Sequence, residues 1–314
     1  MREGVGVGEG GGSWGGRLGG MKICYLGVGA LSTPMIRNLL AAGHEVVVWN
    51  RTRAKAEGLV GDGAVVAETA VEGVAAVSGG GVVVSCLAND EALEAVLGEG
   101  AVFETLGAGG RGGLHVSMST CSPTMMRRLD AVAREHGVTH LTCPVLGRPD
   151  FVERRAHRYA CSGPREAFER IEPVLNDVSE RTFYLGENVE SALVAKLCTN
   201  FLIASAVASI SESLGLARAA GADAEAIREM WNETLFPGVV YTNYSRQILD
   251  EAFDPLFTLR LMLKDVSLFG DAAVDRGVDA AYAAALRERF SRGVDEGLGD
   301  QDFTAISRLA GGKF

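Results

Sequence analysis

The sequence lacks the cysteine patterns that mark disulfide-rich and zinc-binding proteins. Its six cysteines form no CxxC pair, and no Cys/His cluster has the spacing of zinc ligands. Scattered free cysteines are typical of buried thiols in proteins of a reducing compartment. We therefore expect no metal site and a cytoplasmic protein.

Long apolar runs are also missing. The most apolar stretch, residues 193–210, is interrupted by Lys196, Asn200 and two serines, so no run approaches the roughly 18 residues that cross a bilayer. Residues 1–20 contain no apolar segment of the kind found in signal peptides, but they hold ten of the 41 glycines. We expect a disordered glycine-rich tail over residues 1–20, a folded chain that begins near Met21, and no contact with a membrane.

Basic residues are fewer than acidic ones, and few of the basic residues are lysines. The 314 residues include 30 basic and 40 acidic side chains, a formal net charge of −10, which argues against nucleic acid as a partner. Only five of the basic residues are lysines, and the other 25 are arginines. Hydrophobic residues make up 47% of the chain, which is enough for a substantial core and excludes a mostly disordered protein.

Residues 21–186 alternate short apolar runs with segments of helical periodicity. The runs predict strands at Lys22–Leu26, Glu45–Trp49, Ala64–Val66, Val82–Cys86, Leu114–Met118, His140–Cys143, Arg158–Cys161 and Thr182–Leu185. Helices are expected at residues 32–42, Asp90–Leu97, Pro123–His136 and Pro164–Leu175. This alternation predicts a doubly wound, mostly parallel α/β sheet with its ligand crevice at the carboxyl ends of the strands.

Beyond Gly186 the strand signals stop. A long helix is predicted over Asn188–Ala220, and further helices follow at Asp223–Trp231, Thr242–Glu251, Thr258–Arg276, Ala280–Gly293 and Phe303–Leu309. We therefore expect an α/β domain over residues 21–186 and an all-α domain over residues 187–314.

The loop after the first strand is rich in glycine and leads into a helix. It reads Gly27-Val28-Gly29-Ala30-Leu31-Ser32. Gly27 allows a tight turn, Gly29 lets the backbone approach a pyrophosphate, and the helix N-terminus supplies a positive partial charge. The pattern predicts a dinucleotide-binding loop, although Ser32 stands where a third glycine is usual. The alternative is a plain turn in an unrelated α/β protein.

The end of the second strand bears on which nicotinamide cofactor is used. Sites that prefer NAD(H) place Asp or Glu there, on the ribose 2′-hydroxyl. This chain has Trp49-Asn50-Arg51-Thr52-Arg53 instead, with no carboxylate and with two guanidinium groups that match the geometry of a phosphate. We predict that NADP(H) is preferred over NAD(H). The alternative is that these arginines only lie in water at a strand end.

Lys196 lies on the apolar long helix. Asn200 is four residues further on and therefore shares its face. Burial among apolar neighbours lowers the pKa of a lysine, which suits a general acid or base near neutral pH. The alternative is a lysine whose charged end reaches water at the helix edge. All five histidines lie between residues 44 and 157, which excludes a histidine acid from the second domain.

Four segments of the chain, in this order, resemble those of the β-hydroxyacid dehydrogenase family, which includes 3-hydroxyisobutyrate dehydrogenase and the N-terminal part of 6-phosphogluconate dehydrogenase. They are Gly27–Ser32 with Val46–Thr52, Ser119-Thr120-Cys-Ser-Pro123, Pro144-Val145-Leu146-Gly147, and Gly186 followed by Lys196-x-x-x-Asn200; Lys264-Asp265 resembles a fifth. The resemblance covers about residues 21–310. It implies a Rossmann domain, a long interdomain helix, an all-α domain that forms a homodimer, and a small-molecule substrate bound in the cleft between the domains.

The resemblance also implies roles for single residues. Lys196 is expected to be catalytic, with Asn200 beside it, in hydride transfer between the nicotinamide and a carbonyl carbon. Together with the glycine loop and the strand end, the expected cofactor contacts are Gly27, Val28, Gly29, Ala30, Leu31, Ser32, Asn50, Arg51, Thr52, Leu87, Ala88, Thr120 and Lys264. The expected substrate contacts are Ser119, Leu146, Gly147, Arg148 and Trp231.

One segment departs from the family pattern. After Pro-Val the family usually carries Ser-Gly-Gly, whose hydroxyl and amides hold the substrate carboxylate, whereas this chain has Leu146-Gly147-Arg148. Either Arg148 replaces the anion contact as a bidentate fork, or the substrate is not a simple hydroxy acid, or Arg148 is only a surface residue. The apolar Leu146 favours the second interpretation.

Two other functions stay open. Imine reductases resemble this chain in fold, in the Val-Trp-Asn-Arg-Thr strand end and in NADPH use, but carry Asp or Tyr where Lys196 stands. A non-catalytic NADP(H)-binding protein is expected to have lost the lysine, which is present. The function that we expect is NADPH-dependent hydride transfer to or from a small β-hydroxyacid or semialdehyde, with Lys196 as general acid or base.

Overall fold

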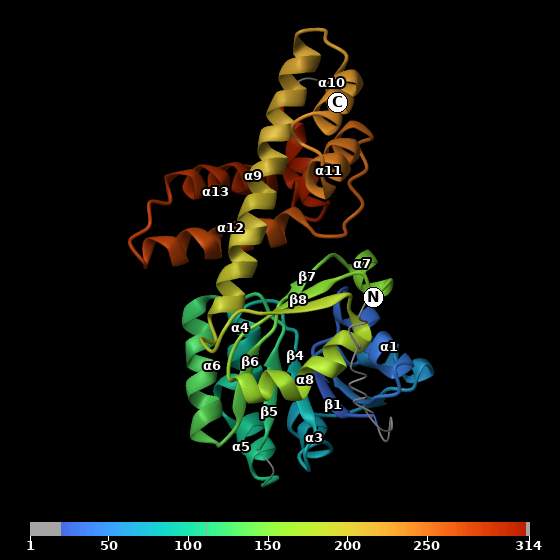
Figure 1. The fold of residues 1–314 in the computed structure, drawn as a ribbon, viewed down its shortest axis with the longest axis vertical. Coiled ribbons are helices and arrows are strands. Elements are labelled where there is room, and N and C mark those ends of the chain that lie inside the picture. Colours follow the sequence, from blue (N-terminus) through green and yellow to red (C-terminus); the bar gives the residue numbers. More distant parts are fainter. Residues whose placement is uncertain (1–19, 111, 312–314) are drawn as a thin grey trace, which may run out of the picture.

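The protein consists of two parts stacked along its long axis (Figure 1). The computed structural model describes residues 20–110 and 112–311. The lower part in Figure 1 is α/β and the upper part is built from helices. Apart from Gly20, the tail expected over residues 1–20 lies outside the described residues.

Six strands form one parallel sheet in the α/β part. They are β1 (Lys22–Leu26), β2 (Glu45–Trp49), β3 (Val65–Val66), β4 (Val82–Ser85), β5 (Leu114–Ser117) and β6 (Thr139–Thr142). Their spatial order is β3-β2-β1-β4-β5-β6, and every neighbouring pair is parallel. The predicted α/β fold is confirmed. Because the strand order reverses between β1 and β4, the ligand crevice of such a sheet lies at the carboxyl ends of these two strands.

A second, smaller sheet corrects the expectation that all strands join one sheet. It contains β7 (Val145–Leu146), β8 (Arg158–Cys161) and β9 (Arg181–Tyr184), with β7 antiparallel to β8 and β8 parallel to β9. Only two residues separate β6 from β7, whereas a parallel return in the same sheet needs a crossover of about a dozen residues. The chain therefore turns away from the main sheet at Cys143.

Alternating side chains of the strands pack against helices on both faces of the main sheet. Ile23 and Tyr25 point into one apolar cluster, whereas Cys24 and Leu26 point into the other. The helices of this part are α1 (Ser32–Ala41), α2 (Arg53–Glu57), α3 (Ala70–Ala75), α4 (Asp90–Leu93), α5 (Ala101–Gly107), α6 (Pro123–Glu135), α7 (Pro149–Glu153) and α8 (Arg165–Val178). The predicted cap of α6 is present, since the Ser122 hydroxyl accepts a hydrogen bond from the Met125 amide at 3.0 Å.

The upper part is organised around one long helix. The helices are α9 (Ser191–Ala219), α10 (Ala224–Glu233), α11 (Val239–Leu249), α12 (Leu259–Val274) and α13 (Ala281–Gly293), followed by a 3₁₀ segment at Phe303–Ala310. In Figure 1, α9 rises out of the α/β part, with α10 and α11 on one side and α12 and α13 extending to the other. Leu193 and Leu197 of α9 belong to the same apolar cluster as Phe103 and Met126, which fixes the first turns of α9 to the α/β part.

The length and composition of α9 correct another expectation. An 18-residue window of this helix has a mean hydropathy of 1.8, so by these two measures alone it could cross a membrane. Of this window, 44% is buried inside the protein. Side chains of α9 also belong to the cores of both parts. Long core helices of soluble proteins pass the same test, so the window is weak evidence for a membrane span.

A carboxylate joins the two parts at the foot of α9. Glu190, whose side chain is 12% exposed, pairs with Arg127 of α6 at 2.9 Å and with Arg276 at the end of α12. Arg127 belongs to the α/β part and Arg276 to the helical part. The ion pairs therefore connect the two parts on the α6 side of the molecule (Figure 1).

Candidate functional site

The glycine loop lies at the carboxyl end of β1, where the sheet predicts a ligand. Gly27 has φ +102°, and a Cβ there would stand 2.4 Å from the Cys86 carbonyl oxygen, so only glycine fits this turn. A Cβ on Gly29 would meet no heavy atom within 4 Å. The first turn of α1 has no acidic residue, and no side chain caps it. The loop thus has the open approach and the positive helix end that a pyrophosphate requires.

Asn50 holds the glycine loop against the end of β2. Its Oδ1 accepts a hydrogen bond from the Val28 amide at 2.9 Å, and its Nδ2 donates to the Thr52 carbonyl at 2.9 Å. Both ends of the Asn50 amide are therefore occupied within the protein. Asn50 therefore positions the glycine loop.

The two arginines after β2 are in different states. Arg53 pairs with Glu57 at 2.8 Å and with Glu68 at 2.5 Å. Arg51 is exposed, and none of the residues in the described ranges 20–110 and 112–311 forms an ion pair or hydrogen bond with its guanidinium. Arg51 is therefore the guanidinium that is free to meet a ligand.

The loops after β4 and β5 are tied together beside the glycine loop. The Ser119 hydroxyl accepts a hydrogen bond from the Leu87 amide at 2.8 Å, and Ser119 is buried. Leu87 and Thr120 are partly exposed and Ala88 is exposed. Ser119 was expected to contact the substrate. In the structure its hydroxyl holds the Leu87 loop in place.

Lys196 and Asn200 face α12 of the helical part. The Asn200 Nδ2 donates a hydrogen bond to Asp265 Oδ2 at 2.5 Å, and Lys264 Nζ lies 3.1 Å from Asp265 Oδ1. Lys264 also donates a hydrogen bond to the Thr120 carbonyl at 2.6 Å, which connects α12 to the loop after β5. Asp265, which is 2% exposed, was not among the predicted site residues, although it holds both Asn200 and Lys264.

The surroundings of Lys196 perturb its amine. Burial lowers the pKa of Lys196 below its ordinary value; the Asp265 charge raises that pKa and the Lys264 charge lowers it further. Within the part of the chain that the structure describes, no group accepts a hydrogen bond from this amine. A lysine in this state can exchange its proton at a lower pH than a solvated one.

The segment Leu146-Gly147-Arg148 leads from β7 into α7. A Cβ on Gly147 would stand 2.8 Å from the Cβ of the buried His157, so the backbone here is packed against β8. The Arg148 guanidinium reaches the other part of the protein, with its carbon 5.8 Å from the ring centre of Tyr244 on α11. Arg148 therefore lies at the junction between the two parts.

Trp231 stays apart from these groups. It is half-buried on α10 and packs at the edge of the helical core. Among the described residues, no hydrogen bond or ring contact joins Trp231 to the cluster of Lys196, Asn200 and Asp265.

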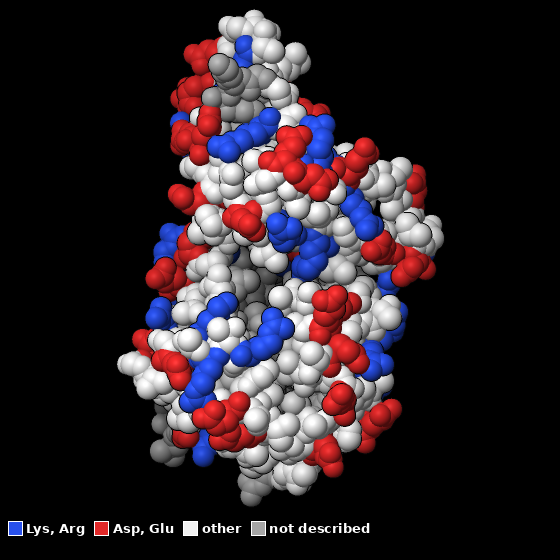
Figure 2. Space-filling view, turned by 180° about the vertical axis from the view of Figure 1, so that it is seen from behind, with Lys and Arg blue, Asp and Glu red and all other residues white. Residues whose placement is uncertain are grey.

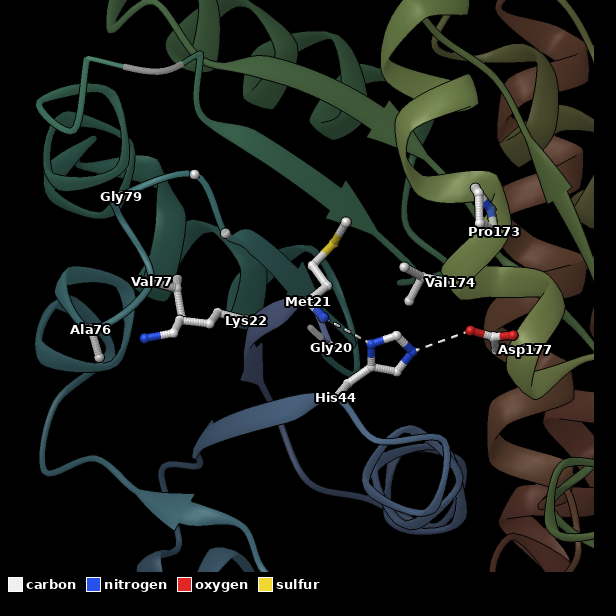
Figure 3. A pocket seen from close by; sticks show the side chains of 12 residues that line it. Gly20, Met21, Lys22, His44, Ala76, Val77, Gly79, Pro173, Val174 and Asp177 are labelled. Carbon is white, nitrogen blue, oxygen red and sulfur yellow. Dashed lines mark hydrogen bonds and ion pairs between the residues drawn. The ribbon is translucent and has the colours of Figure 1, made fainter. Parts of the chain in front are cut away.

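The space-filling view is consistent with a site between the parts. Figure 2 shows a hollow at the junction, with Lys and Arg side chains on its rim. A cavity of about 580 Å³ lies elsewhere, lined by Met21, Lys22, His44 and Gly79–Gly81 among others (Figure 3). These residues stand at the amino ends of β1, β2 and β4, at the opposite end of the sheet from the glycine loop. The cavity in Figure 3 is therefore not the crevice that the strand order predicts.

The fold and the glycine loop define a two-part, NAD(P)-dependent oxidoreductase. Residues 22–186 match the model of the NAD-binding domain of 6-phosphogluconate dehydrogenase, and residues 191–310 match the NAD-binding model of NADP-dependent 3-hydroxyisobutyrate dehydrogenase. The chain belongs to the β-hydroxyacid dehydrogenase family, as the sequence predicts.

Relatives and solved structures agree with this assignment. The uncharacterized oxidoreductase YfjR of Bacillus subtilis is 35% identical over 91% of this chain and 98% of its own length. The 3-hydroxyisobutyrate dehydrogenase of Mycobacterium tuberculosis, solved with L-serine, has a TM-score of 0.80 and 25% identity over 92% of this chain and 99% of its own. An imine reductase of Streptomyces aurantiacus has a TM-score of 0.62 and 27% identity, over 92% of this chain and 99% of its own.

Proposed function

We propose that the protein transfers hydride from NADPH to a small carbonyl compound of the semialdehyde or β-keto acid type, and runs the reverse reaction on the matching hydroxy compound. The observation that carries this proposal is the amine of Lys196, which burial perturbs beside the Asn200–Asp265 hydrogen bond. The bound nicotinamide supplies or accepts the hydride at its C4 atom. Gly27, Gly29 and the α1 N-terminus are the groups of this chain that fit its pyrophosphate.

Lys196 acts as general acid in the reducing direction. Its Nζ holds the proton that the carbonyl oxygen takes up as the hydride arrives, and it removes that proton again in the oxidising direction. A pKa below the ordinary value for lysine makes this proton easier to release. Asn200, with Nδ2 held by Asp265, keeps Oδ1 and one N–H for the substrate hydroxyl or the ammonium group.

Lys264 has a positioning role. Its hydrogen bond to the Thr120 carbonyl and its ion pair with Asp265 join the loop after β5 to the helix that faces Lys196. The nicotinamide pocket and the acid–base pair are thereby held in one arrangement. Alignment of this kind accelerates a reaction by placing the reacting atoms together before the chemical step.

The preference for NADP(H) is assigned to Arg51. Replacing Arg51 with alanine is expected to lower kcat/KM for NADPH by about 10- to 100-fold, because a charge-assisted bond to the 2′-phosphate is lost. The value for NADH is expected to change little. Steady-state kinetics with both cofactors measures the ratio.

Arg53→Ala is the matched control for this experiment. Arg53 is already paired with Glu57 and Glu68, so its removal is expected to affect the cofactor ratio much less than removal of Arg51. An NADPH/NADH ratio that Arg51→Ala leaves unchanged contradicts the assignment.

A panel of substrates tests the proposed reaction against its alternatives. We expect NADPH consumption with small aldehydes and semialdehydes. Consumption with a cyclic imine but with no aldehyde would instead favour an imine reductase. Tight NADPH binding without turnover of any compound would favour a non-catalytic binding protein.

We also propose a homodimer formed through the helical part, in the cytoplasm. Large apolar side chains are exposed on α9, on α10, in the segment between α10 and α11, and at the start of α11, among them Leu216, Met230, Leu235 and Val239. Apolar surface of this kind marks an interface. Light scattering is expected to give twice the mass of the 33.0 kDa chain. A monomer at micromolar concentration would contradict the dimer.

A further inference from the structure

Two of the six cysteines lie opposite each other on antiparallel segments. Val145 of β7 is paired with Tyr159 of β8, and the two strands run in opposite directions. Cys143 precedes Val145 by two residues, and Cys161 follows Tyr159 by two residues. If the register continues beyond β7, Cys143 and Cys161 are therefore direct cross-strand neighbours.

Backbone hydrogen bonds on both sides of the two cysteines show that the register does continue. The Thr142 amide donates to the Ser162 carbonyl at 3.0 Å, and the Ser162 amide donates to the Thr142 carbonyl at 2.9 Å. On the other side, the Ala160 amide donates to the Pro144 carbonyl at 3.3 Å. The two cysteines between them form a pair without mutual hydrogen bonds, and the Cα atoms of such a pair are about 4.5 Å apart. A disulfide needs a Cα separation of about 4.4 to 6.8 Å.

The two thiols point to the same side of the strands. Cys143 and Cys161 are both fully buried, and both belong to the apolar cluster that contains Val145 and Tyr159. Alternate residues of a strand share a face, so this membership agrees with the register. Burial raises the pKa of the Cys143 thiol, and the neighbouring Cys161 raises it further. The two sulfur atoms therefore face each other within one apolar environment.

The other four cysteines do not compete for this pairing. Cys24 and Cys121 belong to the cluster on the other face of the main sheet, and Cys198 is exposed on α9. Cys86 packs against the same cluster as Cys143, but it follows β4 whereas Cys143 follows β6, and β5 lies between these strands. Two strand spacings amount to about 9 to 10 Å, which is more than the roughly 7 Å that a disulfide can span.

We propose that Cys143 and Cys161 form a modification site, at which a peroxide converts the two thiols into a reversible disulfide that ties the end of β6 to β8. Residues 144–160, which include β7 and α7, then lie in a closed loop. The pair stays reduced in a reducing compartment until peroxide is present. The site is independent of the proposed function, since it needs neither cofactor nor substrate.

The reaction is balanced by one molecule of hydrogen peroxide. The thiolate of one cysteine attacks a peroxide oxygen, the O–O bond breaks, and a sulfenic acid and a hydroxide form. The second thiolate attacks the sulfenic sulfur and expels a second hydroxide as the S–S bond forms. The two thiol protons convert the hydroxides into water, so sulfur is oxidised and the peroxide oxygens are reduced. Because the raised pKa makes the thiolate scarce, the reaction is slow at neutral pH.

Peptide mapping of the oxidised full chain tests the pairing directly. The protein is treated with hydrogen peroxide at mildly alkaline pH, its remaining thiols are alkylated in denaturant, and the digest is analysed by mass spectrometry. We expect a peptide in which Cys143 is linked to Cys161, and we expect dithiothreitol to release it. Both cysteines recovered as alkylated thiols, a link from either to another cysteine, or a sulfinic acid at either without a link would overturn the proposal.

The thermal unfolding midpoint gives a second measurement. Closing the loop restricts the unfolded chain, so oxidation is expected to raise the midpoint of the wild type by about 3 to 10 °C. Cys143→Ala and Cys161→Ala are expected to show no such rise. Cys86→Ala is the matched control, because it removes another thiol at the same cluster, and it should respond as the wild type does.

No rise in the wild type, or an equal rise in Cys143→Ala, contradicts the proposal. If the two alanine variants do not fold, the linked peptide of the wild type decides the pairing alone. Loss of the link in Cys86→Ala would show that Cys86 takes part in it, and would also count against the assignment.

Discussion

Lys196→Ala is expected to lower kcat for carbonyl reduction by about 10²- to 10⁴-fold, the range that a general acid or base contributes. Alanine is a strong helix former and leaves α9 without a charge in its half-buried face, so the fold and NADPH binding should persist. Steady-state kinetics with NADPH and a semialdehyde, together with the thermal unfolding midpoint, measures both effects. Near-wild-type kcat in this variant would show that the proton comes from another group.

The dependence of kcat/KM on pH is a second test of the role of Lys196. In reduction Lys196 must carry the proton, so kcat/KM is level below its pKa and falls as pH rises through that pKa, which burial places below 10.5. In oxidation the dependence is reversed. The fall is expected to disappear in Lys196→Ala. Lys22→Ala, which removes an exposed lysine at the opposite end of β1, should keep the wild-type profile.

Alanine at the two glycines of the loop is expected to give two different defects. In Gly27→Ala the new Cβ would stand 2.4 Å from the Cys86 carbonyl oxygen at a φ of +102°, so the backbone must move, at a cost of about 1–3 kcal/mol or more in folding free energy. In Gly29→Ala the Cβ meets nothing within 4 Å. The fold should therefore be kept, but the methyl group stands where the pyrophosphate approaches, and NADPH affinity should fall at least about 10-fold.

Thermal unfolding without ligand and a titration with NADPH separate the two defects. Gly61→Ala is the matched control, because Gly61 also has open space around its Cβ and lies outside the loop. It is expected to match wild type in both measurements. A Gly29→Ala variant with wild-type NADPH affinity would rule out pyrophosphate binding at this loop.

The parts of the site that could be predicted from the sequence are those encoded by local spacing. Gly27 and Gly29 sit between a strand and a helix, and Lys196 and Asn200 are four residues apart on one helix, so neighbouring residues alone define the geometry. The main sheet was predictable for the same reason, since each buried strand is a short apolar run. Resemblance to the family added Lys264 and Thr120, which the structure joins by a hydrogen bond.

The contacts between distant segments could not be predicted in this way. Asp265 meets Asn200 across 65 residues of sequence. The resemblance of Lys264-Asp265 to a family segment marks this position, but no local pattern indicates that its carboxylate contacts Asn200. Tyr244 carries no motif at all, and its approach to Arg148 depends on how α11 lies over α7. The second sheet was missed because its strands look like those of the first, and only the short link from β6 to β7 distinguishes them.

The two sides of the junction differ in the contacts that cross it. On the α6 side, the largely buried carboxylate of Glu190 forms ion pairs with Arg127 and Arg276, whereas on the α7 side the Arg148 guanidinium contacts the Tyr244 ring. The two parts are therefore joined at three separate places: by ion pairs at the foot of α9, by the Lys264–Thr120 hydrogen bond, and by the ring contact of Arg148.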